Sequence, residues 1–488
     1  MAEDEKLNEQ IVKKTIDSEE LEEIIKSKDK KKLRDLFVTI PAIDLAEAAN
    51  DIPDEDLIYI FRTVESAYTA DFFAELSSDA KESLIKAMTD KELVSVINGQ
   101  SADDVTDAVV DLPANLASRV MRAADPDMRK DINTLLNYKE DTAGALMTTE
   151  YLEFLGDMTV EEAIEAIRAK GKDAETIYTI FVKDKQRHFL GTVDLDDLIF
   201  ASKDQKLSDI MNKDVVSCLT STDQEEVGQM FARYDLNAMA VLNEDKRLVG
   251  VITIDDAVDV LTEESNEDVA RLTNMEPTEV PYMELNTWEN AKRCIPWIII
   301  LLVLGTFGSM ILSFFQDKLE ALAVLAAFIP TLLDTGGNSG GQTTGLMVRS
   351  LALKEFGPKQ MLKVLWRELK AGIVVGAIVA CFAFAWFTME QYTGIVSNGE
   401  FDGVNIWAGN CWNMAFFEAT MKISSLVSLT AFLAIALSKV IGALLPLTAA
   451  ALKRDPALVS QPLLTTIMDI VTLIVYFSVA MAFFPQLA

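Results

Sequence analysis

An acidic side chain, Asp469, lies in the middle of the apolar stretch QPLLTTIMDIVTLIVYF, residues 461–477. A carboxylate at the centre of a membrane-spanning helix costs about 2.5–3.5 kcal/mol on insertion scales, and such residues mark ion or proton paths. Within several helical turns the sequence offers no lysine or arginine as a partner. We therefore expect Asp469 to contact a cation, with a protonated or hydrogen-bonded aspartic acid as the alternative.

A second apolar segment contains a run that is unusually polar and glycine-rich for a span, FIPTLLDTGGNSGGQTTG at residues 328–345. At membrane depth, irregular backbone is tolerated only where it is buried in protein or lines water. Small residues also let helices approach closely, so a packing seam is the alternative to a pore. A further segment holds Glu418 and Lys422 four residues apart, which favours a structural ion pair.

These segments offer carboxylate, amide and carbonyl oxygens, the ligands that hard divalent cations prefer. Mg²⁺ gives up its water reluctantly, so a wide site with few carboxylates suits the hydrated ion. In a symmetric dimer Asp469 would occur twice around the central axis, which doubles the negative charge.

Most of the charge lies before the apolar segments. The sequence has 488 residues with 76 acids and 44 bases, a net charge of −32, yet residues 293–488 hold only 11 of the acids and 12 of the bases. Such an acidic surface attracts cations and repels nucleic acid. One histidine, His188, and four cysteines without a CxxC pair leave little for a zinc site or histidine-based catalysis. We expect His188 to be a surface residue of a polar turn.

Five lipid-compatible segments follow residue 290, at about 294–316, 319–348, 368–389, 411–438 and 463–485. Lysine and arginine gather before the first span, between the second and third, and between the fourth and fifth. The positive-inside rule then puts the N-terminus in the cytoplasm and the C-terminus outside. The opening MAEDEKLNEQ has no apolar signal-peptide core, which agrees with a cytoplasmic first part.

Helical segments flank the central part of the acidic region. We predict a charged helical lead over residues 1–34, an all-helical acidic domain over 35–138, and a linking helix over 263–290. The acidic domain is broken at TIPAID, NDIPDED, LSSDAK, DLPAN and ADPDM, and each break offers a Ser, Asp or Pro for a new helix start. The linking segment places four charged residues at the spacing of one helix face: Glu264, Glu267, Asp268 and Arg271.

The central part is an internal repeat of β-α-β-β-α type, with copies at residues 139–202 and 203–262. It resembles the tandem CBS pair, a regulatory module that often binds adenine nucleotides or metal ions. In CBS domains a G-h-h-[ST]-x-x-[DN] stretch binds a ribose, and the second copy matches it with Gly250, Thr253 and Asp256. The first copy has Asp194 in place of the Ser or Thr. The resemblance therefore implies ATP as a regulatory ligand at Thr253 and Asp256.

The order of these parts, with PTLLDTGGNSG and DPALVSQPLLTTIMD in the membrane region, resembles the MgtE family of magnesium channels. The resemblance implies an all-α superhelical cytoplasmic domain, an α/β tandem CBS pair, a plug helix, and a membrane domain of five helices over residues 291–488. It implies that the dimer pore is lined by Pro330, Gly336, Gly337, Asn338, Gly340, Gln461 and Asp469. It implies magnesium-sensing acids at Asp103, Asp107, Glu225, Asp235, Asp256, Asp259, Glu264, Glu267 and Asp268.

These features predict a homodimeric Mg²⁺ channel or transporter of the plasma membrane rather than an enzyme. Mg²⁺ entering between acidic cytoplasmic faces would cross-link them, and clustered carboxylates supply the differential affinity that favours one compact state. We expect high cytosolic Mg²⁺ to close the pore and ATP to tune this closure. The alternative is a CBS-regulated transporter of another divalent cation such as Co²⁺ or Mn²⁺.

Three rival classes fit the sequence less well. Asp334-Thr335-Gly336 spells the DTG of aspartic proteases, but soluble DTG enzymes are all-β and the membrane kind carries a GxGD sequence that is absent here. A coupled carrier of another ion or an osmolyte would show inverted repeats among its spans, and these five segments show none. The GGNSG run argues against a scaffold or sensor without transport.

Overall fold

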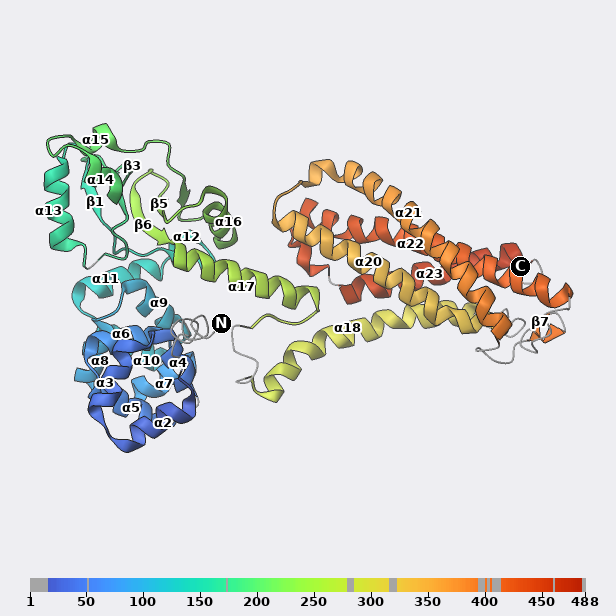
Figure 1. The fold of residues 1–488 in the computed structure, drawn as a ribbon, viewed down its shortest axis with the longest axis horizontal. Helices are drawn as coiled ribbons and strands as arrows, with labels where there is room; N and C mark the ends of the chain where they lie inside the picture. Colours follow the sequence, from blue (N-terminus) through green and yellow to red (C-terminus); the bar gives the residue numbers. More distant parts are fainter. Residues whose placement is uncertain are drawn as a thin grey trace, which may run out of the picture. The chain divides into compact units, whose positions relative to one another are not determined.

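The computed structural model describes residues 16–50, 52–172, 174–278, 285–315, 323–393, 400–401, 404–405, 414–459 and 461–484. The chain divides into two compact units, Met1–Leu261 and Thr262–Ala488, and each is described by itself. Figure 1 gives the element labels.

The first unit begins with a superhelix of short helices, in which each helix packs mainly on the second one after it. Its helices are α2 (Ser18–Ser27), α3 (Lys30–Thr39), α4 (Ala42–Ala49), α5 (Asp54–Thr63), α6 (Ser66–Ala74), α7 (Ser78–Ala87), α8 (Asp90–Ile97), α9 (Ala102–Asp111), α10 (Ala114–Ala123) and α11 (Pro126–Leu135). The five breaks read in the sequence are confirmed as helix starts. Their N-cap residues are Pro41, Pro53, Ser77, Pro113 and Asp125.

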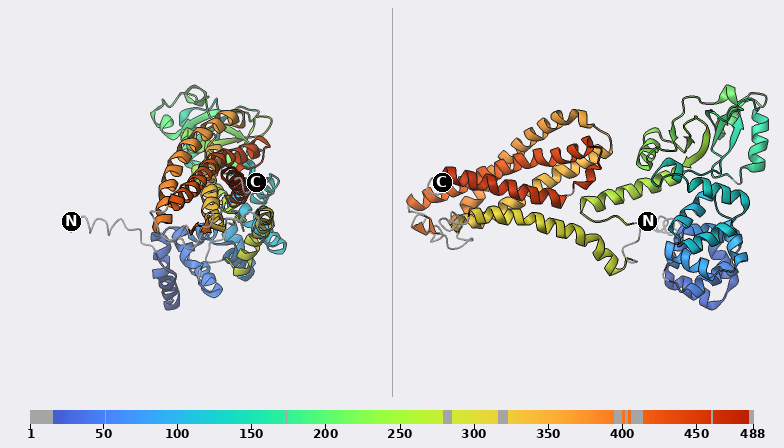
Figure 2. Two further views of the ribbon diagram at one scale, coloured as in Figure 1. Left: turned by 90° about the vertical axis from the view of Figure 1, so that its right-hand side faces the viewer. Right: turned by 180° about the vertical axis from the view of Figure 1, so that it is seen from behind.

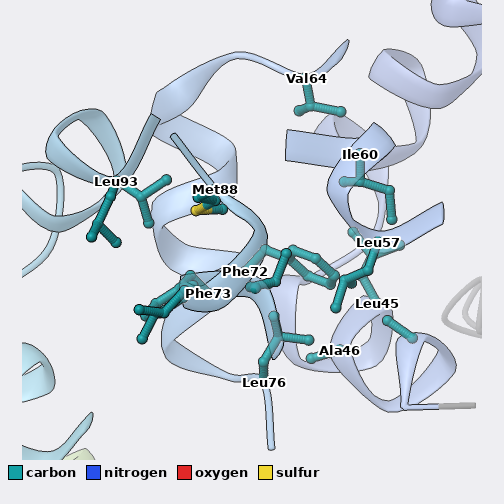
Figure 3. Packing of buried hydrophobic residues seen from close by; sticks show 14 of the residues in the cluster. Leu45, Ala46, Leu57, Ile60, Val64, Phe72, Phe73, Leu76, Met88 and Leu93 are labelled. Carbon is teal, nitrogen blue, oxygen red and sulfur yellow. The ribbon is translucent and has the colours of Figure 1, made fainter. Parts of the chain in front are cut away.

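A continuous apolar core runs through these helices. Figure 3 shows Phe72 and Phe73 of α6 between Leu57 and Ile60 on one side and Leu93 on the other. Residues 16–34, predicted as a charged lead, contribute to the same core through Leu21, Ile24 and Ile25. The amphipathic spacing of α2 therefore binds it to the domain despite its charged surface.

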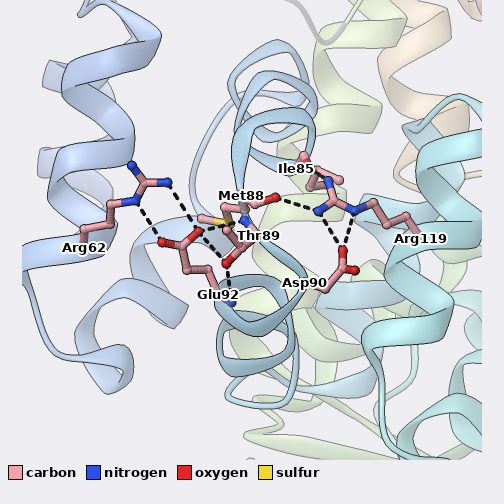
Figure 4. Close-up of polar contacts among 7 residues, drawn as sticks. All are labelled: Arg62, Ile85, Met88, Thr89, Asp90, Glu92 and Arg119. Carbon is pink, nitrogen blue, oxygen red and sulfur yellow. Dashed lines mark hydrogen bonds and ion pairs between the residues drawn. The ribbon is translucent and has the colours of Figure 1, made fainter.

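Two arginine side chains form ion pairs and hydrogen bonds between helices of the superhelix (Figure 4). Arg62 on α5 pairs with Glu92 on α8, with Nε 2.8 Å from Oε1, and Glu92 also completes a capping box with Thr89. These hydrogen bonds, the one from Arg62 first, lower the pKa of Glu92 to about 2. Arg119 on α10 donates to the carbonyl oxygen of Met88 and to Asp90. Helices far apart in sequence thus keep a fixed register.

The second half of this unit contains two three-stranded sheets with the same topology. The elements of the first copy are α12 (Ala143–Leu146), β1 (Glu153–Leu155), α13 (Val160–Lys170), β2 (Thr179–Lys183), β3 (Phe189–Asp194) and α14 (Leu195–Phe200). Those of the second are α15 (Leu207–Ile210), β4 (Ser217–Leu219), α16 (Gln224–Tyr234), β5 (Ala238–Leu242), β6 (Leu248–Thr253) and α17 (Ile254–Leu272). The predicted internal repeat is confirmed.

The two copies match down to their strand registers. In each copy the first strand pairs in parallel with the second, and the second pairs antiparallel with the third. A register shift falls at Val182/Lys183 in one copy and at Val241/Leu242 in the other. His188 bridges to Arg247 of the other copy, and its ring Nδ1 lies 2.9 Å from Asp184 Oδ2. His188 is half exposed, as predicted for a turn residue.

The second unit is built from long helices that run side by side (Figures 1 and 2). They are α18 (Thr287–Phe314), α20 (Ile329–Ala352), α21 (Met361–Thr393), α22 (Met414–Ala451) and α23 (Gln461–Phe483). Short elements lie between them: η1 (Ala323–Phe328), η2 (Pro358–Gln360), β7 (Glu400–Phe401), β8 (Val404–Asn405) and η3 (Pro456–Leu458).

Within the described residues, four of the five predicted spans are long and apolar enough to cross a membrane: α18, α21, α22 and α23. The remaining helix, α20, corresponds to the predicted second span 319–348, whose first part falls in residues 316–322, outside the described residues. Its glycines, threonines and amides lower its hydropathy below that of the others. Its place in the bundle therefore depends on its packing partners rather than on its own affinity for lipid.

Candidate functional site

Helix α20 presents four glycines to α22 and α23: Gly336, Gly337, Gly340 and Gly341. A Cβ atom at Gly336 would lie 2.7 Å from Thr472 Oγ1, and one at Gly340 would lie 2.5 Å from Ser438 Oγ. Thr344 Oγ1 donates to the carbonyl oxygen of Gly442 at 3.1 Å. The packing alternative therefore holds for the glycine face, because only residues without a side chain allow this approach.

The opposite face of α20 is an exposed polar stripe. Four residues spaced i, i+4 are exposed on it: Pro330, Asp334, Asn338 and Gln342. The packing seam and the proposed pore lining thus correspond to opposite faces of α20. Glycines form a seam, and the stripe offers oxygens to whatever lies beside it.

Asp469 lies on α23 between residues that touch the glycine face. Thr465 contacts Gly337, Thr472 contacts Gly336, and Gln461 packs on Gly341. Asp469 itself is half-buried, and its carboxylate is close enough to Asp334 for the two charges to repel each other. Among the described residues no ion pair or hydrogen bond of Asp469 is found. Glu418 and Lys422, by contrast, form the predicted pair, with Nζ 3.0 Å from Oε1.

Two members of the stripe, Asp334 and Gln342, were not among the predicted pore residues. The signal that identifies them is the four-residue spacing that extends from Pro330 through Asn338. The DTG triplet of residues 334–336 lies inside α20, whereas aspartic proteases need it at the end of a strand. This placement removes the protease interpretation of Asp334.

A cytosolic carboxylate cluster lies between α9 and the start of α17. Asp103 and Asp107 of α9 interact electrostatically with Asp256 of α17. Asp103 Oδ1 accepts a hydrogen bond from Thr148 Oγ1 at 3.1 Å. Burial, reinforced by Asp103 and Asp104, raises the pKa of Asp107 to about 7, and burial raises the pKa of Asp256 to about 6.

More acids surround this cluster than the sequence indicated. Burial and the charge of Asp103 raise the pKa of Glu150 and of Glu175 to about 7. Glu75 lies near enough to feel Asp104 and Asp259, and burial raises its pKa as well. Lys81 is the base that interacts with several of these acids, although burial lowers its pKa. We call Glu75, Asp103, Asp107, Glu150, Glu175 and Asp256 the cytosolic cluster.

The donor set of the cytosolic cluster fits a divalent cation, since unneutralised carboxylates are its natural ligands. In the described residues the three-acid group whose oxygens converge within 4.8 Å is a different one: Asp194 at the end of β3, and Asp196 and Asp197 on α14. No three carboxylates of the cytosolic cluster converge within that distance in the described residues. A cation held there would bind partly through its own water, as Mg²⁺ commonly does.

The structure does not bring Glu225 and Asp235 together. They lie at opposite ends of α16, about 15 Å apart at 1.5 Å per residue. Glu225 accepts a hydrogen bond from Gln229, and Asp235 caps the helix in the left-handed conformation with φ 53°. Asp259 is exposed on α17.

A second group of acids lies at the end of α17. It belongs to the second compact unit, Thr262–Ala488, which we call the membrane unit. Arg271 pairs with Glu267 one turn earlier and with Asp455, the N-cap residue of η3. Burial, with Asp455 and Glu264 adding repulsion, raises the pKa of Asp268 to about 6. The sequence indicated the α17 face, but Asp455 was missed because no local pattern links it to residues 184 positions earlier.

The predicted linking segment 263–290 is not one continuous helix in the described residues. Helix α17 ends at Leu272, where Asn274 adopts φ 60° and the amide of Met275 donates to the carbonyl oxygen of Ala270. This is a typical helix C-terminus. Residues 279–284 of the segment lie outside the described part, and α18 begins at Thr287.

A cavity of about 900 Å³ lies between the two sheet copies. Thr253 lines it, and its hydroxyl donates to Asp256 Oδ2 at 2.7 Å, but Asp256 is not a lining residue. Tyr178, Ile199 and Asn237 supply apolar and amide surface. The charged residues that line the cavity are all acidic: Glu175, Asp194, Asp196 and Asp255.

The chain matches three protein-family models. They are a divalent cation transporter model over residues 329–479, the MgtE intracellular N domain over 40–141, and the CBS domain over 143–204 and 207–263. These matches cover the helices from α20 to α23, the superhelix from α4 on, and the repeat.

Curated relatives agree with these matches. The magnesium transporter MgtE of Thermus thermophilus is 32% identical over 464 residues, which cover 94% of this chain and 97% of the relative. The magnesium transporter MgtE of Bacillus subtilis is 27% identical over 456 residues, 91% of this chain and 95% of the relative. The crystal structure of the cytosolic domain of the Mg²⁺ channel MgtE in complex with ATP is 34% identical, with a TM-score of 0.48, and covers 50% of this chain and 100% of that one.

Proposed function

Because the chain belongs to the MgtE family of divalent cation transporters, we propose that it imports Mg²⁺ along the polar stripe of α20 and the acid of α23. The observation that carries this proposal is the exposed row Pro330, Asp334, Asn338 and Gln342 beside Asp469. Acidic and amide groups in a membrane helix avoid lipid, so they face water or another protein chain. The predicted spans and basic loops place this path in the plasma membrane, with the C-terminus outside.

A two-fold dimer supplies the second wall of the path. With one chain, the stripe has an open side; a second copy related by symmetry would face it with the same residues. Asp334 and Asp469 would then each occur twice around the axis. Few carboxylates combined with amide and hydroxyl oxygens suit an ion that keeps much of its water.

The cytosolic cluster and the acids at the end of α17 form the proposed sensor. Their carboxylates repel one another while no cation is bound, and the raised pKa values record that repulsion together with burial. Mg²⁺ at these positions would favour the compact arrangement and close the pore, because a ligand shifts a conformation only through unequal affinity for its states.

ATP is a second ligand that this proposal includes, and the cavity of the repeat is its site. Thr253 and Asp255 offer oxygens to ribose hydroxyls, while Tyr178 and Ile199 offer an apolar wall for a base. The acidic lining repels free phosphates. The nucleotide would therefore enter as its magnesium complex, which links ATP binding to the same ion.

Mg²⁺ uptake into proteoliposomes tests this function. Wild type should take up Mg²⁺, Asp469→Ala should abolish uptake, and Glu418→Gln should retain it, since Glu418 is paired with Lys422 on α22 and belongs to neither the stripe nor α23. Parallel uptake of Co²⁺, Mn²⁺ and Ca²⁺ distinguishes magnesium selectivity from the alternative of another divalent cation. Unchanged Mg²⁺ uptake in Asp469→Ala would exclude this residue as the pore ligand.

A further inference from the structure

A cavity of about 410 Å³ separates the end of α17 from the start of α18 in the membrane unit. Its walls are largely apolar, formed by Met275, Pro277, Pro296, Trp297, Ile300 and Leu458. Three charged side chains also line it: Arg271, Glu276 and Arg293. This cavity takes no part in the proposed ion path or in the cytosolic cluster.

The two arginines of the cavity differ in their partners. Arg271 is engaged by Glu267 and Asp455. Arg293 Nη1 is buried and has no hydrogen-bond partner among the residues that the structure describes. A buried guanidinium N–H without an acceptor is costly, so an acceptor from outside the chain would be favoured at this point.

The position of Arg293 along α18 indicates the level in the membrane at which the cavity lies. The helix begins at Thr287, Lys292 and Arg293 end its polar first part, and from Cys294 it continues as an apolar span. Basic residues at this boundary lie at the level of the cytoplasmic phospholipid headgroups. Trp297 and Ile300, one and two turns further, extend the apolar wall toward the acyl-chain region.

We propose that this cavity binds the headgroup of an acidic phospholipid, whose phosphate accepts hydrogen bonds from Arg293. Guanidinium and phosphate pair through charge-assisted hydrogen bonds, and basic pockets at the cytoplasmic side of membrane helices suit anionic headgroups. Glu276 at the same cavity favours a headgroup that also carries hydroxyl donors, as the glycerol of phosphatidylglycerol does. The acyl chains would follow the exposed surface of Ile300 along α18.

The lipid would also touch the end of the sensing helix. Arg271 and Met275 of the cavity belong to α17 and to the turn that ends it, a few residues after Glu267 and Asp268. Lipid occupancy would therefore bias the position of that helix end. This regulatory consequence rests on the proposed function, whereas the binding site itself does not.

Native mass spectrometry of the full chain, titrated with phosphatidylglycerol or phosphatidylcholine, tests the site. Wild type should retain phosphatidylglycerol in preference to phosphatidylcholine. Arg293→Gln should weaken its binding by about tenfold or more, the loss expected for a buried charge-assisted pair. Lys292→Gln is the matched control, because Lys292 is an exposed cation on the same helical turn as Arg293. Its ammonium group lies over the Trp288 ring. This variant should bind as wild type does.

Three results would overturn the proposal. Equal binding by Arg293→Gln and wild type would exclude the cavity, and equal loss in Lys292→Gln would show only general attraction to the basic end of α18. Displacement of the lipid by sn-glycerol 3-phosphate at matched concentration would identify a soluble phosphate as the occupant. If Arg293→Gln does not fold, Arg293→Lys carries the test and should retain the preference at reduced affinity. Mg²⁺ uptake, measured separately, shows whether the proposed function fails independently.

Discussion

The cytosolic cluster and the membrane stripe both gather acidic residues, but they do so in opposite ways. The cluster holds six carboxylates with Lys81 as a nearby base, and burial raises the pKa of several of them to about 6 or 7. The membrane region has two acids near each other, Asp334 on the stripe of α20 and Asp469 on α23, among amides and threonines. Many carboxylates bind a cation and hold it, whereas few carboxylates with neutral oxygens let a hydrated cation pass.

The two regions also differ in the interactions that stabilise them. The cluster lies between elements that repel each other unless a cation is present. The stripe is supported from behind by a seam of glycines whose close contacts need no ion. We therefore expect the cytosolic unit to respond to Mg²⁺ in its stability and the membrane unit to respond to changes in packing.

The largest expected effect is the loss of Mg²⁺-dependent stabilisation in the full chain. A ligand that binds only the folded state adds about 2.7 kcal/mol at 100 times its Kd. The double variant Asp107→Asn/Asp256→Asn should lose most of the rise in unfolding temperature with Mg²⁺, measured by thermal unfolding. Glu47→Gln, an exposed acid on α4, is the control and should keep the rise. An undiminished rise in the double variant would remove the cluster from the sensor.

The next effect concerns the seam behind the stripe. Gly340→Ala forces a methyl group against Ser438 Oγ and Leu464, whereas Gly345→Ala on the same helix meets nothing within 4 Å. Both changes raise helix propensity equally, so their difference isolates the clash, which should cost about 1–3 kcal/mol. Thermal unfolding in detergent measures it. Equal stability of the two variants would mean that the seam is loose and that the packing account of α20 is wrong.

A pH dependence should distinguish the regions further. Asp107, Glu175 and Asp256 have folded-state pKa values above those of unfolded carboxyls, so the folded state binds more protons between about pH 4 and pH 7. Their contribution to stability is present below pH 4 and is lost as the pH rises through 6 to 7. Without Mg²⁺ the unfolding temperature of the cytosolic unit should therefore fall by a few degrees from about pH 5 to pH 8.

Mg²⁺ should flatten this dependence, because it neutralises the carboxylates after they lose their protons. The scan is made on the full chain with and without Mg²⁺. A cytosolic transition that becomes more stable toward pH 8 without Mg²⁺ would contradict the assigned repulsion.

The smallest effect is expected at Arg271. This guanidinium already neutralises Glu267 and Asp455, so it competes with a cation at the end of α17. Arg271→Gln should lower the Mg²⁺ concentration that closes the pore by a few-fold, about 1 kcal/mol. The measurement is Mg²⁺ uptake against Mg²⁺ on the cytoplasmic face. A higher closing concentration would show that Arg271 instead holds the closed arrangement.

Much of the architecture follows from sequence patterns with a local physical cause. Caps at Ser77 and Asp125 start helices where they are expected, and the repeated sequence pattern predicts the repeated order of helices and strands. The i, i+4 pairing of Glu418 with Lys422 is local as well. Such features depend on neighbours in the chain, which a sequence shows directly.

The features that sequence reasoning missed depend on contacts between distant segments. Asp455 meets Arg271 across 184 positions, and Glu75, Glu150 and Glu175 join the cytosolic cluster from separate elements. Asp334 was visible in the sequence but was weighed only as part of a protease triplet. The structure places it on the exposed polar face of α20, opposite the glycine face.

One measurement tests most directly whether Asp469 is needed for Mg²⁺ conduction and the cytosolic cluster for closure by Mg²⁺. Mg²⁺ uptake by oriented proteoliposomes is followed at low and high Mg²⁺ on the cytoplasmic face, for wild type, Asp469→Asn and Asp107→Asn/Asp256→Asn. The account predicts that Asp469→Asn takes up no Mg²⁺ at either level, while the double variant conducts at both and wild type only at the low level. Uptake by Asp469→Asn that equals wild type, or a double variant that still closes at the wild-type Mg²⁺ level, would contradict it.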